Sequence, residues 1–85
     1  MNDNKVLVEL VVPSIDMKYN VFFPINRKIG NIIGLLNKVL NETTNGLYVG
    51  NEFTELYDST SGEVYSINSL VRETNIRNGS VVILL

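Results

Sequence analysis

The sequence predicts an α+β domain in which one amphipathic helix packs on one face of a mixed β-sheet. Two observations predict this class. Apolar, β-branched runs occur near both ends of the chain and again in its second half, and a single stretch with helical periodicity lies between the first of these runs and the rest. A chain of 85 residues can bury one modest hydrophobic core, so we expect a single domain over residues 1–85.

The N-terminal segment predicts a β-hairpin. Residues 5–12 (KVLVELVV) are rich in β-branched residues, and residues 18–23 (KYNVFF) alternate after the turn signals of PSIDM. Pro24 ends the second strand because it has no N–H for the ladder. Strand alternation places Leu7 on the opposite face from Val8 in the first strand.

The next segment predicts an α-helix. Apolar side chains recur at helical spacing along one side of it, at Ile29, Ile32, Ile33, Leu36, Val39 and Leu40. Asn26 is the predicted N-cap. The pattern ends at TTNG, where Gly46, or Asn45 before it, can adopt the left-handed conformation of a helix C-terminus.

The second half of the chain predicts a further hairpin. Residues 53–57 (FTELY) and 63–66 (EVYS) flank the turn-rich sequence DSTSG. The preceding segment 47–50 (LYVG) fits either a short strand or a packed loop.

The closing segment predicts a single helical turn and a last strand. We expect the turn around residues 69–72, with Ile67 and Leu70 anchored inward. After the tight turn at Asn78 and Gly79, the chain continues through an unbroken apolar run, VVILL.

Composition excludes several classes of function. There is no cysteine and no histidine, which excludes disulfides, thiolate nucleophiles, imidazole bases and zinc sites built from these residues. The net charge is −2 and the basic residues are scattered along the sequence, which argues against nucleic acid as a partner. No stretch approaches the ~18 apolar residues of a membrane span, and no signal peptide opens the chain. We expect a cytoplasmic protein.

Three acidic residues are the remaining candidates for a catalytic site. Glu52, Glu55 and Asp58 lie near one another in the sequence, but no base or hydroxyl partner accompanies them. A solvated strand edge is favoured over a catalytic pair. We therefore expect no catalytic, cofactor-binding or metal-binding residue, and a protein that is not an enzyme.

The order hairpin, helix, hairpin, helical turn, strand resembles the ubiquitin-like β-grasp fold. VFFPIN resembles the passage from the second strand to the helix, and SINSLVRETNIRNGSVVILL resembles the closing segment of ubiquitin-like domains. The resemblance implies that the last strand lies in the centre of the sheet, beside the first strand and parallel to it. Burial on both faces would then explain its unbroken apolar run.

Within this fold, the sequence resembles the YukD-like family of type VII (WXG100/ESX-like) secretion systems of Gram-positive bacteria. The residues that carry the likeness are IRNGSVVILL, with Ser80 in place of a usual acidic residue, and the helix opening IGNIIGLL. The resemblance implies a cytoplasmic accessory or regulatory component, peripheral to the membrane apparatus. Its partners would be proteins, including membrane or ATPase components. A generic ubiquitin-like adaptor unrelated to secretion is the alternative.

The C-terminal segment bears on conjugation. Ubiquitin-type modifiers carry a flexible extension ending in Gly-Gly, whose carboxylate is activated and joined to lysine. No glycine follows Gly79 here. The resemblance therefore implies a module that binds without being conjugated.

The sheet face away from the helix is the predicted docking surface. The residues assigned to it are Leu7, Val11, Phe22, Val82 and Leu84. An apolar patch of this kind commonly marks an interface, and a homodimer through it stays open. Under the alternative interpretation, Tyr48, Tyr57 or the 47–52 loop covers this face from within the chain.

Two glycines on the helix flank, Gly30 and Gly34, have two interpretations. They mark either the close approach of a partner backbone or close packing against the domain's own sheet or its 47–52 loop, and the second is favoured.

Overall fold

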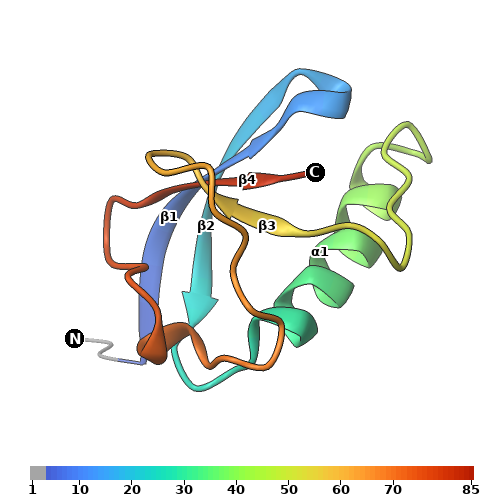
Figure 1. Cartoon of the computed structure of the whole chain (residues 1–85). Coiled ribbons are helices and arrows are strands. Elements are labelled where there is room, and N and C mark those ends of the chain that lie inside the picture. The colour runs from blue at the N-terminus through green and yellow to red at the C-terminus, as the bar shows by residue number, and fades with distance from the viewer. Residues whose placement is uncertain (1–3) are drawn as a thin grey trace.

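In the computed structural model, which describes residues 4–85, one helix crosses one face of a four-stranded sheet (Figure 1). The strands are β1 (Lys5–Val12), β2 (Met17–Pro24), β3 (Leu56–Asp58) and β4 (Val81–Leu84), the helix is α1 (Ile29–Thr43), and two 3-10 turns are η1 (Pro13–Ile15) and η2 (Val71–Glu73).

The sheet has the order β2-β1-β4-β3. β1 pairs antiparallel with β2 and parallel with β4, and β3 pairs antiparallel with β4. The predicted mixed sheet, and the central place of the last strand beside the first, are therefore confirmed. The parallel register places Leu10 opposite Val82, although these two residues are far apart in the sequence.

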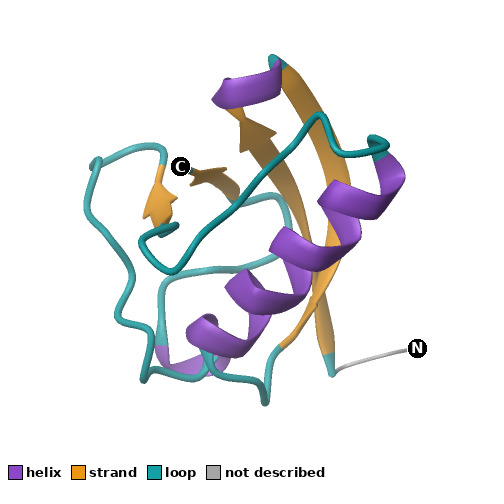
Figure 2. Cartoon of the chain, turned by 90° about the vertical axis from the view of Figure 1, so that its right-hand side faces the viewer, coloured by secondary structure: helices purple, strands orange, loops and turns teal. Residues whose placement is uncertain are grey.

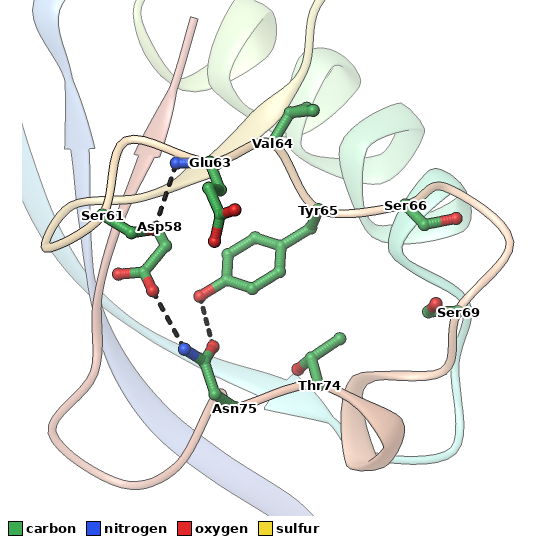
Figure 3. Close-up of a pocket in the computed structure, with 9 residues that line it drawn as sticks. All are labelled: Asp58, Ser61, Glu63, Val64, Tyr65, Ser66, Ser69, Thr74 and Asn75. Atoms are coloured by element: carbon green, nitrogen blue, oxygen red, sulfur yellow. Dashed lines mark hydrogen bonds between the residues drawn. The ribbon is translucent and has the colours of Figure 1, made fainter.

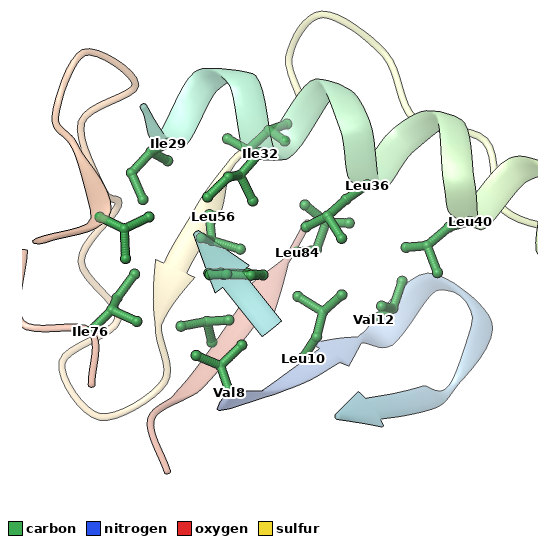
Figure 4. Close-up of a cluster of buried hydrophobic side chains, with 14 of the residues drawn as sticks. Val8, Leu10, Val12, Ile29, Ile32, Leu36, Leu40, Leu56, Ile76 and Leu84 are labelled. Carbon is green, nitrogen blue, oxygen red and sulfur yellow. The ribbon is translucent and has the colours of Figure 1, made fainter. Parts of the chain in front are cut away.

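The core lies between the sheet and α1 (Figures 2 and 4). Alternate residues of each strand point toward the helix, and the helix returns one apolar side to them. The buried apolar residues are Val8, Leu10, Val12, Phe23, Ile29, Ile32, Ile33, Leu36, Leu40, Tyr48, Leu56, Val71, Ile76, Val82 and Leu84. Val39, predicted in the helical stripe, lies at its margin and is 44% exposed.

The helix begins differently from the prediction. Asn26 is not the N-cap; Lys28 occupies that position and makes no side-chain capping bond. Backbone carbonyls from the closing segment accept the first helical N–H groups instead, with Ile29 N to Ser69 O at 2.9 Å and Gly30 N to Ile67 O at 3.0 Å. A distant segment of backbone thus does the work that a capping side chain does elsewhere.

The helix ends as expected. Asn45 and Gly46 both have positive φ, at 52° and 83°, and Gly46 N donates to Asn41 O at 2.8 Å.

The second hairpin is smaller than predicted. β3 has three residues, and the predicted partner strand at 63–66 is reduced to one bridge between Tyr57 and Val64. Phe53, predicted to start β3, is 78% exposed. The turn residues of DSTSG hold the two segments together without a regular ladder, through Asp58 N to Glu63 O and Gly62 N to Asp58 O.

The helical turn forms slightly later than predicted, at η2. Val71 is its buried residue, whereas Ile67, predicted as an inward anchor, is 54% exposed. Ile67 uses its carbonyl to meet α1, and its side chain is left outside.

Candidate functional site

The outer face of the sheet carries an exposed apolar pair. Leu7 and Phe22 are direct partners in the antiparallel register of β1 and β2, and their side chains are 40% and 61% exposed. Val11, on the same face of β1, is half-buried. The structure therefore confirms where the sequence placed these three residues.

The predicted positions of Val82 and Leu84 were wrong. Both point toward α1 and are 0% and 1% exposed. Val82 lies opposite Leu10, and Leu84 lies opposite Leu56, so each shares the core face of its neighbour. An unbroken apolar run has no alternation from which to assign a face, and an error of one residue turns every side chain over.

Val81 and Ile83 occupy the outer face of β4 instead, and both are half-buried. Burial on both faces of β4 is thus incomplete. Tyr57 of β3 lies opposite Ile83, and its hydroxyl donates to Glu55 Oε2 at 3.0 Å. That hydrogen bond to the carboxylate raises the pKa of Tyr57 above its usual value.

The loop after α1 does not cover the outer face. Figure 2 shows it running back along the helix toward β3. Tyr48 packs on the helix side, 4% exposed, where its hydroxyl donates to Asn37 Oδ1 at 2.6 Å. Asn41 Nδ2 donates to Tyr48 O at 2.8 Å. Burial raises the pKa of Tyr48. Of the groups proposed to cover the face, Tyr57 alone contributes.

The same loop displays three apolar side chains that the prediction did not single out as a surface. Leu47, Val49 and Phe53 are 70%, 74% and 78% exposed. Leu47 and Val49 belong to the segment that was left undecided between strand and loop, and Phe53 was predicted to lie at the start of a strand.

The helix glycines differ from each other. A Cβ on Gly30 would lie 3.1 Å from Ile67 O, so close packing explains this glycine, although against the 66–70 segment rather than the sheet or the 47–52 loop. A Cβ on Gly34 would meet nothing within 4 Å.

A polar hollow of about 340 Å³ opens beside β3 (Figure 3). Asn75 lines this hollow and bonds to two other lining residues. Its Nδ2 donates to Asp58 Oδ2 at 2.9 Å, and its Oδ1 accepts from the Tyr65 hydroxyl at 2.7 Å. Thr60 N also donates to Asp58, at 2.9 Å. The side-chain bond from Asn75, with the backbone bond from Thr60, lowers the pKa of Asp58.

The hydrogen bonds in this hollow connect β3 to the segment that follows η2. The Asp58 carboxylate is ionised and already bonded on both oxygens, so it is poorly suited to accept a proton from a substrate. Ser61, Ser66 and Ser69 line the hollow, but the only carboxylates among its lining residues are Asp58 and Glu63. Burial raises the pKa of the Tyr65 phenol, and the negative charge of Asp58 raises it further.

Within residues 4–85, acidic side chains nowhere gather in a group of three or more able to hold a metal ion. Over the same residues, α1 and the short turns fall below the length and hydropathy that a membrane-crossing helix requires.

Comparison with known proteins identifies the fold. No family model matches the sequence, and no curated protein matches it. Among solved structures, a chain of the ESX-5 inner membrane complex matches with TM-score 0.78 and 15% identity over 96% of this chain, which spans 21% of that chain. The EccD5 ubiquitin-like domain from Mycobacterium xenopi matches with TM-score 0.77 and 21% identity, covering 95% of this chain and 92% of the domain.

A plant protein gives a third match. The ubiquitin-like domain of an Arabidopsis thaliana protein has TM-score 0.71 and 17% identity, covering 96% of this chain and 77% of that one. At identities this low the likeness establishes the fold alone. The chain is a ubiquitin-like β-grasp domain.

Proposed function

We propose that this chain is a non-covalent protein-interaction module that serves a bacterial type VII secretion system as a cytoplasmic accessory or regulatory component. The observation that carries the proposal is the exposed Leu7–Phe22 pair on the outer sheet face of a fold similar to the EccD5 domain. The chain similar to it within the ESX-5 inner membrane complex supports a partner in a membrane assembly.

The outer face suits binding in its composition. Leu7 and Phe22 are surrounded by Val11, Val81 and Ile83, which are half-buried and add apolar surface at the margin. Covering a large apolar side chain contributes roughly 1.5–3 kcal/mol. Lys5 and Lys18 lie at opposite ends of this face and Glu9 lies between them, so we expect a partner with an apolar centre and a polar rim.

We propose further that the module acts without catalysis and without conjugation. The sequence has no histidine or cysteine to serve as base or nucleophile. Leu85 N donates to Glu55 O at 3.0 Å and Glu55 N donates to Leu85 O at 2.9 Å, so backbone pairing continues one residue beyond β3 and β4. Incubation with an activating enzyme and ATP should yield neither an adenylate nor a thioester.

The test is site-specific photo-crosslinking in a bacterium that carries a type VII system. A photoreactive phenylalanine analogue at Phe22 should crosslink to a component of the secretion apparatus, and Leu7→Asp should abolish that crosslink. The matched control places the analogue at Phe53, which is also exposed but lies on the loop after α1. Equal crosslinking from both positions, or crosslinks only to proteins outside the apparatus, would contradict the proposal.

A generic adaptor is the second candidate. The comparable likeness to the plant ubiquitin-like domain favours it, because that protein has the same fold in another setting. Neighbouring genes for small helical secreted substrates and a membrane ATPase would favour the secretion role, and their absence would favour the adaptor.

A further inference from the structure

The structure gathers basic residues that are dispersed in the sequence. Five of the seven cationic residues lie at the end of the molecule where α1 begins, namely Lys5, Arg27, Lys28, Arg72 and Arg77. Figure 1 shows the start of β1, the connection from β2 to α1 and the η2 turn meeting there. We call this set the basic end. These residues are scattered along the sequence but lie at one end of the folded domain.

Backbone pairing brings these residues together. Arg72 N donates to Ile25 O and Val71 N donates to Arg27 O, both at 3.0 Å, and Lys28 forms a bridge with Leu70. Lys5 lies opposite Pro24 in the register of the hairpin. Backbone pairing therefore fixes the positions of four of the five cations.

An apolar hollow of about 220 Å³ lies within the basic end. Val6, Ile25 and Ile76 form its apolar wall, with Ile76 nearly fully buried at 1% exposed and the other two half-buried. Arg72 and Arg77 border it. The hollow thus combines a small apolar floor with two guanidinium groups at its margin.

The two arginines differ in how they are held. Arg77 Nη1 donates to Thr74 O at 2.8 Å and to Ile76 O at 2.7 Å, which fixes the guanidinium beside the hollow and leaves its other N–H groups available. The Arg72 side chain is exposed and makes no hydrogen bond or ion pair with any of residues 4–85. The nearest acidic side chain in sequence, Glu73, accepts from Leu70 N at 2.8 Å.

The rest of the molecule carries the opposite charge. Glu42 lies in the last turn of α1 and Glu55 pairs with Leu85, beyond the far end of β4. The net charge is −2 although the basic end is positive. An anionic ligand is therefore directed to this end by the field of the whole domain.

We propose that the hollow binds an acidic peptide segment of a protein partner. One aliphatic side chain of the peptide packs on Val6 and Ile25, which are half-buried, and an adjacent carboxylate accepts from Arg72 and Arg77. Arginine is suited to this because its planar guanidinium binds a carboxylate through two parallel hydrogen bonds. Nucleic acid fits less well, since a phosphate backbone leaves the apolar floor of the hollow unfilled. This surface is separate from the outer sheet face, so the proposal does not rest on the secretion role.

The experiment selects binders from a phage-displayed library of random peptides and measures the best of them by fluorescence polarisation. Selected peptides should contain an aliphatic residue flanked by Asp or Glu. Arg72→Glu should weaken their binding about tenfold or more, because it replaces a charge-assisted contact by repulsion. Lys38→Glu makes the same charge change on exposed α1 and should alter affinity less than about twofold.

Amide NMR distinguishes the hollow from the outer sheet face as the place where the peptide binds. Shifts on peptide addition should map to Val6, Ile25, Arg72 and Ile76, and the Arg72→Glu spectrum without peptide should otherwise match the native one. Selection of peptides lacking acidic residues, or shifts confined to Leu7 and Phe22, would overturn the proposal. So would tighter binding of single-stranded DNA or anionic vesicles with the same dependence on Arg72, or self-association that Arg72→Glu abolishes.

Discussion

At the scale of single residues, the contact between Tyr48 and Asn37 determines how the loop after α1 is held. The buried phenol has Asn37 Oδ1 as its acceptor, and Gly50 passes so close that a Cβ there would overlap the Asn37 side chain. Close approach by backbone explains this glycine.

Gly50→Ala should therefore displace Asn37 and leave the Tyr48 hydroxyl without its partner. We expect a loss of about 1–2 kcal/mol in the free energy of unfolding, measured in urea. Gly34→Ala is the matched control: the added methyl meets nothing within 4 Å, and the variant should gain about 0.5–1 kcal/mol from helix propensity. Equal stabilities for the two variants would contradict this account.

A second prediction concerns Asp58 and pH. The hydrogen bond from Asn75 holds the pKa of Asp58 below its usual value. A lowered folded-state pKa stabilises the protein above the unfolded pKa of about 3.9, and this contribution is lost as the pH falls through the lowered pKa.

Asn75→Ala should therefore raise the pKa of Asp58. NMR titration of the Asp58 carboxyl carbon measures this change. The variant should be less stable than the native protein at neutral pH, and the difference should shrink at acid pH. The effect should be small, because the pair lies at the surface. An unchanged Asp58 titration would show that the backbone bond from Thr60 is sufficient.

At the scale of elements, β4 illustrates what the sequence could and could not predict. Its existence, its central place and its parallel partner were predicted from the resemblance and the unbroken apolar run. The sequence did not predict which side chains of β4 face the core, because VVIL contains no polar residue that would mark the outer face. β1 and β2 have Glu9 and Asn20 on the outer face, and there the assignment of Leu7 and Phe22 was confirmed.

Substitutions in β4 test directly which of its side chains face the core. Val82→Ala removes methyl groups from the core and should cost about 2–3 kcal/mol of the free energy of unfolding. Val81→Ala, one residue away on the outer face, should cost less than about 1 kcal/mol. Urea unfolding of both variants measures the difference, and the reverse order would mean that the strand faces the other way.

The predictions of the helix start and of the extent of β3 were wrong for a different reason. Asn26 was the best local capping residue, but the carbonyls of Ser69 and Ile67 cap α1 from the far end of the sequence. β3 is short because its partner segment follows side-chain and turn hydrogen bonds rather than a regular ladder. Both outcomes depend on tertiary contacts that no local pattern records.

At the scale of the whole molecule, the two proposed binding surfaces were predicted to different extents. The outer sheet face was predicted in part, through Leu7, Val11 and Phe22. The basic end was missed, because its five cations come from three separate segments that meet only through the pairing of residues 25–28 with 70–72. The exposed residues Leu47 and Val49 were missed because segment 47–50 has no clear periodicity, and Phe53 was missed because it was expected in a strand.

The parallel pairing of β1 with β4 has a consequence for how the protein is made. Leu10 meets Val82, so the central ladder of the sheet joins residues that leave the ribosome far apart in time. The hairpin and α1 are synthesised first, and their apolar sides stay uncovered until residues 81–84 have cleared the exit tunnel. Loop-closure entropy on this scale slows the final step of folding relative to a local hairpin. The complete sheet therefore forms only after β4 has been synthesised, because β4 lies between β1 and β3.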